Sequence, residues 1–453
     1  MQHIWAKQAL LPTGWAQDVL VSHDGGTICE VVENAKPKGH RVGVLLPAPV
    51  NVHSHAFQRA MAGLTEARGP DGRDSFWTWR HLMFRFLDRL TPPHIEAITA
   101  FVQMEMLEAG YATNTEFHYL HHQPGGTPYD NLAEMTDRII SATAQTGIGL
   151  CLLPVHYQVG GCDGRALSDG QIRFGNDLDR FRLLHDMAGK SLARLPSDAG
   201  LGVAPHSLRA LATQDLRNIT AHFPDGPIHM HLAEQIAEVE EAQAHWGARP
   251  VTWALENMQI DHRWCLIHCT QMTPDETLAL ARTGAVAGLC PITESSLGDG
   301  IFDGVRWLDA GGAMAIGSDS NIRIALSEEM RTLEYTQRLR DHSRAALATP
   351  GQSTGRRIFD SMLIGGAQAA GRKTGKLDRG YLADLLVLDT SAPHLDGRTG
   401  DTLLDTWIFA ADDRLVTDVW SAGRHVVQNG RHIRHQIISD TYRRTLSELR
   451  DAL

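Results

Sequence analysis

Five side chains with metal-binding groups each follow a short apolar run of the kind that forms a buried strand. They are His53 and His55 after LLPAPV, His231 after PIHM, His268 after WCLI, and Asp319 after AMAI. Alternate residues of a strand point to the same side, so His53 and His55 can reach one ion. Nitrogen ligands with one carboxylate suit zinc, or a borderline metal such as ferrous iron. Because a catalytic zinc ion lowers the pKa of its water to about 7, the pattern predicts hydrolysis at neutral pH.

Hydrolysis also needs groups that move protons, and Asp319 and Glu234 are the available carboxylates. Asp319 can ligate the metal or accept the proton of the attacking water, and Glu234 can face a nitrogen of the substrate. The alternative for Glu234 is an acid at a helix N-terminus that complements the helix dipole. A two-metal centre would usually need a bridging ligand such as a carboxylated lysine. Lys190 is the only lysine between His53 and Asp319 and has the pattern of an exposed helix end, which favours one metal ion.

The elements that must position these residues alternate along the chain. Eight apolar runs predict strands: VGVLLPAPV, YATNTEF, IGLCLLPV, GLGVAP, PIHMH, WCLIH, AVAGLC and AMAIG. Helical patterns lie between them, one with the capping-box spacing of Thr273 and Glu276. Eight such units predict an α/β fold, a (β/α)8 TIM-type barrel with its chemistry at the C-terminal rim.

His229 has the same parity as His231, but His231 is nearer the strand end and is the predicted ligand.

The two ends of the chain flank this barrel and are both rich in β-type sequence. Asp24-Gly25-Gly26 near the N-terminus and Asn429-Gly430 near the C-terminus supply turns between strand-like pieces. We therefore expect residues 1–46 and 377–453 to join in a small β-sandwich domain, with residues 47–376 as the metal-dependent barrel domain. The last residues, ISDTYRRTLSELRDAL, predict a terminal helix.

Composition narrows the possible partners. The formal net charge is −11 and there is no long basic run, which disfavours nucleic-acid binding. The six cysteines lack C-x-x-C spacing, and three lie in apolar runs, so we expect reduced thiols. The N-terminus has no signal-peptide pattern, and no span approaches about 20 apolar residues, so we expect a cytoplasmic protein without a membrane partner.

Several motifs carry a resemblance to a known family. HSH, HLAE, IHCT and GSDS, in this order and with the closing pattern GKLDRGYLADLLVLD, resemble the amidohydrolase superfamily, and HLAE resembles its mononuclear deaminase branch. Within that branch, NVHSHAFQRAMAG, DSFWTWR, TEFHYLHH, HSLRA, HLAEQ, LGDGIF and SDSN closely resemble the formimidoylglutamate deiminase family of bacterial histidine degradation. The match runs from about residue 45 to the C-terminus.

The resemblance implies hydrolysis of N-formimino-L-glutamate to N-formyl-L-glutamate and ammonia, with one zinc ion per subunit and Fe²⁺ as the other possible metal. Its hydroxide would attack the formimino carbon. The resemblance also implies a homodimer. Carried onto matching positions, the resemblance assigns the metal to His53, His55, His231 and Asp319. It assigns catalytic roles to Asp319, Glu234, His268 and Gln58, with His268 bonding the water. It implies that the two carboxylates of the dicarboxylate substrate are bound by Arg80, Tyr119, His206 and Arg209.

Two other functions compete with this one. One is an aromatic-ring deaminase or chlorohydrolase of the same superfamily, acting on guanine, an adenosine-type molecule or a triazine; it would need an apolar stacking pocket. The other is a metal-binding scaffold that has lost the reaction, which the presence of all the metal-site residues disfavours. The sequence leaves open whether the segment around Arg80 is a lid, and whether His118, His121 or His122 touches the substrate.

Overall fold

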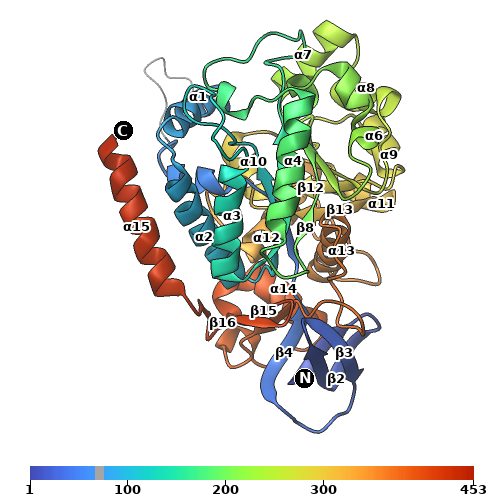
Figure 1. Cartoon of the computed structure of the whole chain (residues 1–453). Coiled ribbons are helices and arrows are strands. Elements are labelled where there is room, and N and C mark those ends of the chain that lie inside the picture. Colours follow the sequence, from blue (N-terminus) through green and yellow to red (C-terminus); the bar gives the residue numbers. More distant parts are fainter. Residues whose placement is uncertain (67–75, 453) are drawn as a thin grey trace.

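The computed structural model describes residues 1–66 and 76–452, with the side chains of 76–78, 80, 81, 451 and 452 excepted. Figure 1 shows a helix-wrapped body with a sheet at one end, where the N-terminal strands lie beside strands from the C-terminal part of the chain. No helix in the described part of the chain has the length and apolar character needed to cross a membrane.

The central strands form a barrel of parallel strands. In order they are β5 (Val50–Ser54), β6 (Thr113–His118), β7 (Gly149–His156), β8 (Gly200–Leu201), β9 (Ala204–Pro205), β10 (Ile228–Leu232), β11 (Trp264–His268), β12 (Val286–Leu289) and β13 (Ala313–Ile316). They pair as two parallel sheets, β5 to β8 with β9 on β7, and β10 to β13. Parallel bridges close both seams, Ser54 to Asp319 and Val203 to Ile228. With β8 and β9 sharing one position, the strands form the predicted eight-stranded barrel.

Helices follow the strands as the alternating pattern predicts. Their bounds are α1 (Phe76–Leu87), α2 (Pro92–Ala109), α3 (Glu134–Thr146), α4 (Leu178–Leu192), α5 (Thr213–Arg217), α6 (Ile219–His222), α7 (Ile236–Trp246), α8 (Pro250–Asn257), α9 (Pro274–Ala281), α10 (Pro291–Leu297), α11 (Gly304–Asp309), α12 (Leu326–Asp341) and α13 (Thr354–Ala369). The short 3-10 helices are η1 (Ala56–Met61), η2 (Ile172–Phe174), η3 (Leu208–Ala210), η4 (Pro393–Leu395) and η5 (Asp413–Leu415). The predicted capping box is present: Glu276 Oε2 accepts the Thr273 N–H at 2.8 Å, and Thr273 Oγ1 accepts the Glu276 N–H at 3.2 Å.

The two chain ends combine in one mixed sheet, as expected for the small β domain. Its strands are β1 (Gln2–Leu11), β2 (Gly14–Asp24), β3 (Thr27–Val32), β4 (His40–Pro47), β14 (Leu385–Leu388), β15 (Val416–Ser421), β16 (Arg424–Gln428) and β17 (Arg431–His432). The order is β17-β16-β15-β14-β4-β1-β2-β3, a single path in place of two separate sheets. An antiparallel bridge between Thr27 and Leu382 joins the edge strand β3 to the segment before β14. The sheet thus rolls around its own core, which includes Ile4, Leu385 and Trp420.

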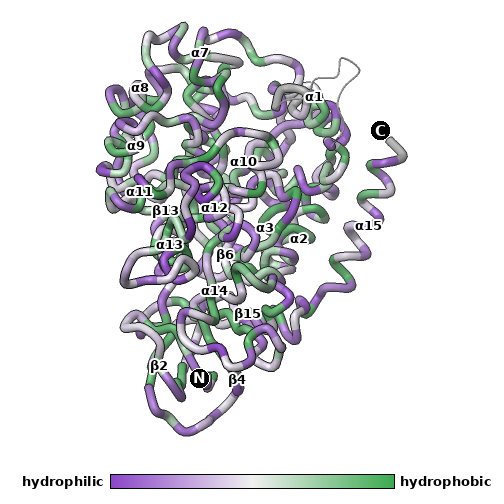
Figure 2. Tube along the Cα trace, turned by 180° about the vertical axis from the view of Figure 1, so that it is seen from behind, coloured by the Kyte–Doolittle hydropathy of each residue, from purple (hydrophilic) through white to green (hydrophobic). Residues whose placement is uncertain are grey.

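Two C-terminal helices pack on the barrel. Helix α14 (Asp401–Ala410) contacts α12 and α13, and α15 (His435–Ala452) runs along α2 on the outside of the molecule (Figure 1). Apolar and polar residues alternate along α15 (Figure 2), and its buried residues Ile438, Tyr442 and Leu449 recur at helical spacing. Tyr442 stacks on Phe101 of α2 with ring centroids 3.9 Å apart. The predicted terminal helix is therefore present.

Candidate metal centre and substrate pocket

Four buried side chains converge at the C-terminal end of the barrel strands. The Nε2 atom of His53 lies 3.1 Å from that of His55 and 3.0 Å from that of His231, and His55 and His231 are 3.4 Å apart. Asp319 Oδ1 is 3.4 Å from His53 Nε2 and 3.3 Å from His55 Nε2. Two ligand atoms about 2.0–2.2 Å from one ion at a tetrahedral angle would be roughly 3.3 Å apart. The spacing of these four groups therefore fits one metal ion.

Hydrogen bonds behind the rings turn two of these imidazoles toward the centre. His55 Nδ1–H donates to the Phe117 carbonyl at 3.1 Å, and His231 Nδ1–H donates to the His206 carbonyl at 3.0 Å. Both bonds leave the Nε2 lone pair facing the cluster, as metal ligation requires. Burial, and then the neighbouring imidazoles, hold the pKa of His53 and of His231 well below the usual value, so both rings are neutral.

Close backbone approach brings Asp319 beside the His-x-His pair. The N–H groups of Ser318 and Asp319 donate to the His53 carbonyl at 3.1 and 2.9 Å, and His55 N–H donates to the Asp319 carbonyl at 2.9 Å. A Cβ on Gly317 would lie 2.6 Å from the His53 backbone nitrogen, so only glycine allows this contact. Asp319 itself has φ 47°, a left-handed conformation that is rare outside glycine and is concentrated at functional sites.

His268 stands beside the four-residue cluster and is not part of it. Its Nδ1–H donates to Glu294 Oε1 at 3.2 Å. Its Nε2 lies 3.8 Å from Glu234 Oε1 and 3.9 Å from Asp319 Oδ2. Burial alone would lower the pKa of His268, but the carboxylates of Glu234, Glu294 and Asp319 raise it well above the usual value. His268 thus presents a proton donor to the space between two carboxylates.

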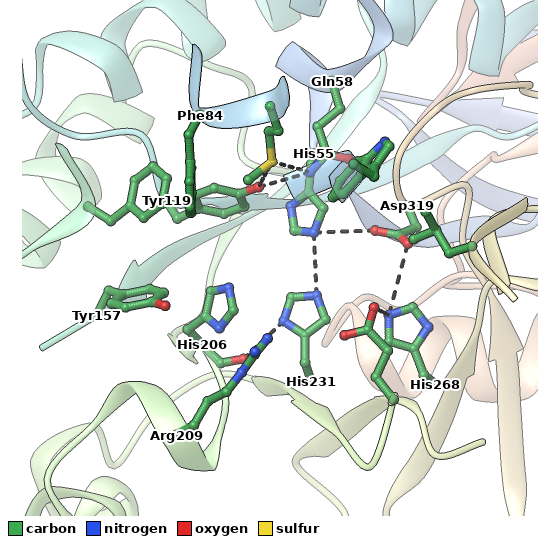
Figure 3. A pocket seen from close by; sticks show the side chains of 15 residues that line it. His55, Gln58, Phe84, Tyr119, Tyr157, His206, Arg209, His231, His268 and Asp319 are labelled. Carbon is green, nitrogen blue, oxygen red and sulfur yellow. Dashed lines mark hydrogen bonds and ion pairs between the residues drawn. The ribbon is translucent and has the colours of Figure 1, made fainter. Parts of the chain in front are cut away.

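These groups open into a shared pocket. It contains four of the other residues named from the sequence: Gln58, Tyr119, His206 and Arg209 all line it. Figure 3 shows Arg209, His206 and Tyr157 on one side of His231, with His268 and Asp319 on the other. The pocket therefore has a cationic end at Arg209 and a carboxylate end at Asp319, on opposite sides of His231.

Other residues named from the sequence lie elsewhere. Arg80 falls in α1, but its side chain lies outside the described part of the structure. His118, His121 and His122 are buried and absent from the described pocket lining; His121 bonds the Val155 carbonyl and His122 the Gly175 carbonyl. His229 Nε2–H donates to the carbonyl of Ala369 in α13 at 2.8 Å, which turns it away from the cluster.

Sequence reasoning missed several residues of the pocket wall. Tyr157 comes directly after β7, so the rule that located the metal ligands at strand ends could have found it. Its hydroxyl accepts a hydrogen bond from Gln171 Nε2 at 2.8 Å. The aromatic and apolar residues carried by loops and by α1 and α10 had no such signal. The missed lining residues are Trp79, Met83, Phe84, Tyr157, Phe174 and Leu297.

Glu238 supports the pocket from behind. Its carboxylate accepts the N–H groups of Ala233 at 3.2 Å and of Glu234 at 2.9 Å. Burial alone would lower the pKa of Arg209, but Tyr157 and the carboxylates of Glu238 and Glu234 raise it, so the guanidinium stays charged. A buried cation thus lines the pocket.

Comparison with known proteins identifies the family of this chain. Residues 44–426 match the family model described as Amidohydrolase family, and residues 1–41 match Formimidoylglutamate deiminase HutF, N-terminal domain. A formimidoylglutamate deiminase of Pseudomonas aeruginosa is 46% identical, with all of both chains covered. A 5-methylthioadenosine/S-adenosylhomocysteine deaminase of Natronomonas pharaonis is 26% identical over 83% of this chain and 81% of its own.

Solved structures show the same architecture. An amidohydrolase from Brucella melitensis superposes with a TM-score of 0.94 at 45% identity, over 99% of this chain and 100% of its own. An adenosine deaminase from Xanthomonas campestris with bound zinc shares the fold alone, with a TM-score of 0.81 at 20% identity over 99% and 98% of the two chains.

Fold and site together define a metal-dependent hydrolase. The chain belongs to the amidohydrolase family and, within it, to the family of formimidoylglutamate deiminases.

Proposed function

We propose that the protein hydrolyses N-formimino-L-glutamate to N-formyl-L-glutamate and ammonia, as a step of histidine degradation, with one zinc ion held by His53, His55, His231 and Asp319. The observation that carries this proposal is the two-ended pocket, with the buried Arg209 on one side of His231 and Asp319 and His268 on the other, where Glu234 Oε1 lies 3.8 Å from His268 Nε2. The full-length likeness to a formimidoylglutamate deiminase supports it. The proposed homodimer rests on the family resemblance, and the proposed cytoplasmic location rests on the sequence, which has neither a signal-peptide pattern nor a long apolar span.

The donor set suits zinc, since three neutral imidazoles and one carboxylate face a common point. Zinc bound there would supply Lewis-acid activation of water and of the substrate. Fe²⁺ accepts the same ligands, so metal content decides between the two. Asp319 holds Oδ1 toward the histidines and Oδ2 toward His268, which leaves one oxygen to accept the proton of the attacking water.

The remaining groups at the carboxylate end can handle the formimino group. Water adds its oxygen to the formimino carbon, and the carbon–nitrogen bond to the terminal nitrogen breaks. Both water protons must reach that nitrogen, which leaves as ammonia. Burial raises the pKa of Glu234, although His268 and Arg209 oppose the rise, so this carboxyl can carry a proton to the nitrogen. Gln58 Oε1 is buried without a hydrogen-bond partner in the described structure, and it can accept a substrate N–H.

The cationic end can bind the glutamate part. Arg209 presents a planar guanidinium, which matches a carboxylate with two hydrogen bonds. His206 and Tyr119 line the same pocket. Gln58 Nε2–H donates to the Tyr119 hydroxyl at 2.9 Å, which links the two ends of the proposed site. Arg80 is assigned to the second carboxylate by the family resemblance alone.

Substrate preference tests this proposal. Ammonia release should be measured on N-formimino-L-glutamate, on N-formiminoglycine, and on guanine, adenosine and 5-methylthioadenosine. We expect the highest kcat/KM for formiminoglutamate, and a lower value for the glycine compound because it lacks one carboxylate. The purines belong in the comparison because the pocket lining includes the aromatic residues Trp79, Tyr157 and Phe174. A purine turned over faster than formiminoglutamate would overturn the proposal in favour of the ring deaminases.

A further inference from the structure

A second group of metal-binding side chains lies on the rolled sheet at the other end of the molecule. It consists of His40 at the start of β4, Asp418 on β15 and His425 on β16. Asp418 Oδ1 is 2.8 Å from His425 Nε2 and 3.7 Å from His40 Nε2, and the three ligand atoms lie within 4.8 Å of one another. Both imidazoles therefore face the same carboxylate oxygen. Neither the proposed reaction nor the rolled core accounts for this arrangement.

His425 and Asp418 are held in place before any ion arrives. His425 pairs in register with Trp420, and its ring stacks on the indole with centroids 3.9 Å apart and planes within 10°. His40 stands edge-on to both rings, with each centroid 5.4 Å away. Burial alone would raise the pKa of Asp418, but its hydrogen bonds and the neighbouring histidines lower it, so the carboxylate is ionised. Stacking thus fixes His425, whereas His40 contacts the two rings only edge-on and keeps freedom to move.

Ordinary surface pairs of the described chain lack the second imidazole. His94 faces Glu448 at 3.2 Å, and His435 faces Glu108 at 2.7 Å, each as a single histidine–carboxylate pair. A single pair is explained by a hydrogen bond. A hydrogen bond does not explain why His40 also faces Asp418. The distance from His40 Nε2 to Asp418 Oδ1 is 3.7 Å, which is too long for a hydrogen bond.

We propose that His40, Asp418 and His425 bind one divalent transition-metal ion of the zinc class, with water completing its coordination. Two nitrogens and one carboxylate oxygen suit zinc, copper or nickel. The observed separations of 2.8 and 3.7 Å lie on either side of the roughly 3.3 Å expected around a tetrahedral ion. The side chain of His40 is 44% exposed and has room to close the remaining gap.

The ion would cross-link the two ends of the chain. β4 belongs to the N-terminal segment, whereas β15 and β16 come from the C-terminal segment. An ion that binds only the folded sheet stabilises it, because unfolding separates the ligands. The site is therefore structural, and it is independent of the proposed hydrolysis.

Zinc titration of the full-length enzyme tests the proposal. Enzyme already loaded with one zinc per chain is titrated with zinc alone in a calorimeter, and unfolding temperature is followed with and without the added zinc. Wild type should take up one further zinc per chain and unfold at a higher temperature. Asp418→Asn and His40→Gln should each weaken this second binding at least about tenfold, since even residues that only support metal ligands cost 10- to 100-fold.

The control is His94→Gln, which removes a surface histidine from a single pair and should bind the second zinc as wild type does. Without added zinc, both site variants should turn over the substrate at the wild-type rate. That result would show that the zinc ion at the proposed active site is still bound. His40→Gln alters a half-exposed side chain and keeps the test valid if Asp418→Asn fails to fold. The proposal is overturned if wild type binds no second zinc, or if folded His40→Gln binds it as tightly as wild type.

Discussion

Replacing Arg209 by methionine tests the cationic end of the pocket. Methionine keeps much of the apolar length of the side chain and removes the planar guanidinium. Arg209 is 8% exposed, so its bonds to a substrate carboxylate would form away from bulk water. A hydrogen bond to a charged group is worth about 1.5–3 kcal/mol, so a two-bond contact is worth about 3–6 kcal/mol. At about 1.4 kcal/mol per tenfold, kcat/KM for formiminoglutamate should fall about 10²- to 10⁴-fold.

The loss should fall mainly on KM. Arg209 lies across His231 from His268 and Asp319 (Figure 3), so it can hold the substrate without touching the reacting carbon. Removing a contact made equally in the ground state and the transition state raises KM and leaves kcat nearly unchanged. Steady-state ammonia release over a wide range of substrate concentrations separates the two constants.

A control removes an arginine from the sheet at the other end of the molecule. Arg424 Nη2 lies 2.8 Å from Asp198 Oδ2, well away from the pocket. Arg424→Met should lower the unfolding temperature and leave KM at the wild-type value. A KM within twofold of wild type in folded Arg209→Met would refute the placement of the carboxylate there, and an equal rise of KM in Arg424→Met would trace the effect to general destabilisation.

Two further predictions address the metal centre and a buried acid. Asp319→Asn should lower turnover by about 10²- to 10⁴-fold, the usual contribution of one proton-transfer group, and near-normal ammonia release by the metal-loaded variant would contradict the assignment. Burial raises the pKa of Asp413 to about 6, above its usual 3.8, and the ionised form therefore opposes folding. As pH rises from about 4 to 7, the wild-type free energy of unfolding should fall by about 2.4 kcal/mol relative to Asp413→Asn. Denaturant unfolding at both pH values measures this change, and a difference that is independent of pH would count against it.

The proposed metal ligands could be predicted from the sequence because each depends on local rules. Strand parity places His53 and His55 on one side, and in a barrel the ends of distant strands meet at one rim. The cluster of His53, His55, His231 and Asp319 in the structure has the arrangement that these rules predict. The joining of both chain ends was predictable too, since two unpaired β-rich segments need partners. That they form one rolled sheet depends on the Thr27–Leu382 contact, for which the sequence has no signal.

The pocket wall was less accessible to prediction. Trp79, Phe84 and Phe174 come from elements whose positions depend on packing over the rim rather than on strand order. An aromatic residue at such a position has the same sequence pattern as a core residue. Tyr157 is the exception, because it follows β7 directly.

The buried carboxylates that accept backbone N–H groups near the pocket were the least predictable part of the site. Ala233 has φ 50° and His268 has φ 71°, left-handed conformations that cost roughly 1–3 kcal/mol each. The N–H of Ala233 donates to Glu238, and the ring of His268 donates to Glu294, which also accepts the Cys290 N–H at 2.8 Å. Such charge-assisted bonds are strong enough to offset strain of this size. By holding these turns, Glu238 and Glu294 place Glu234 and His268 at the pocket. The sequence does not reveal this role, because its helical pattern shows each of them only as an acid in the first turn of a helix.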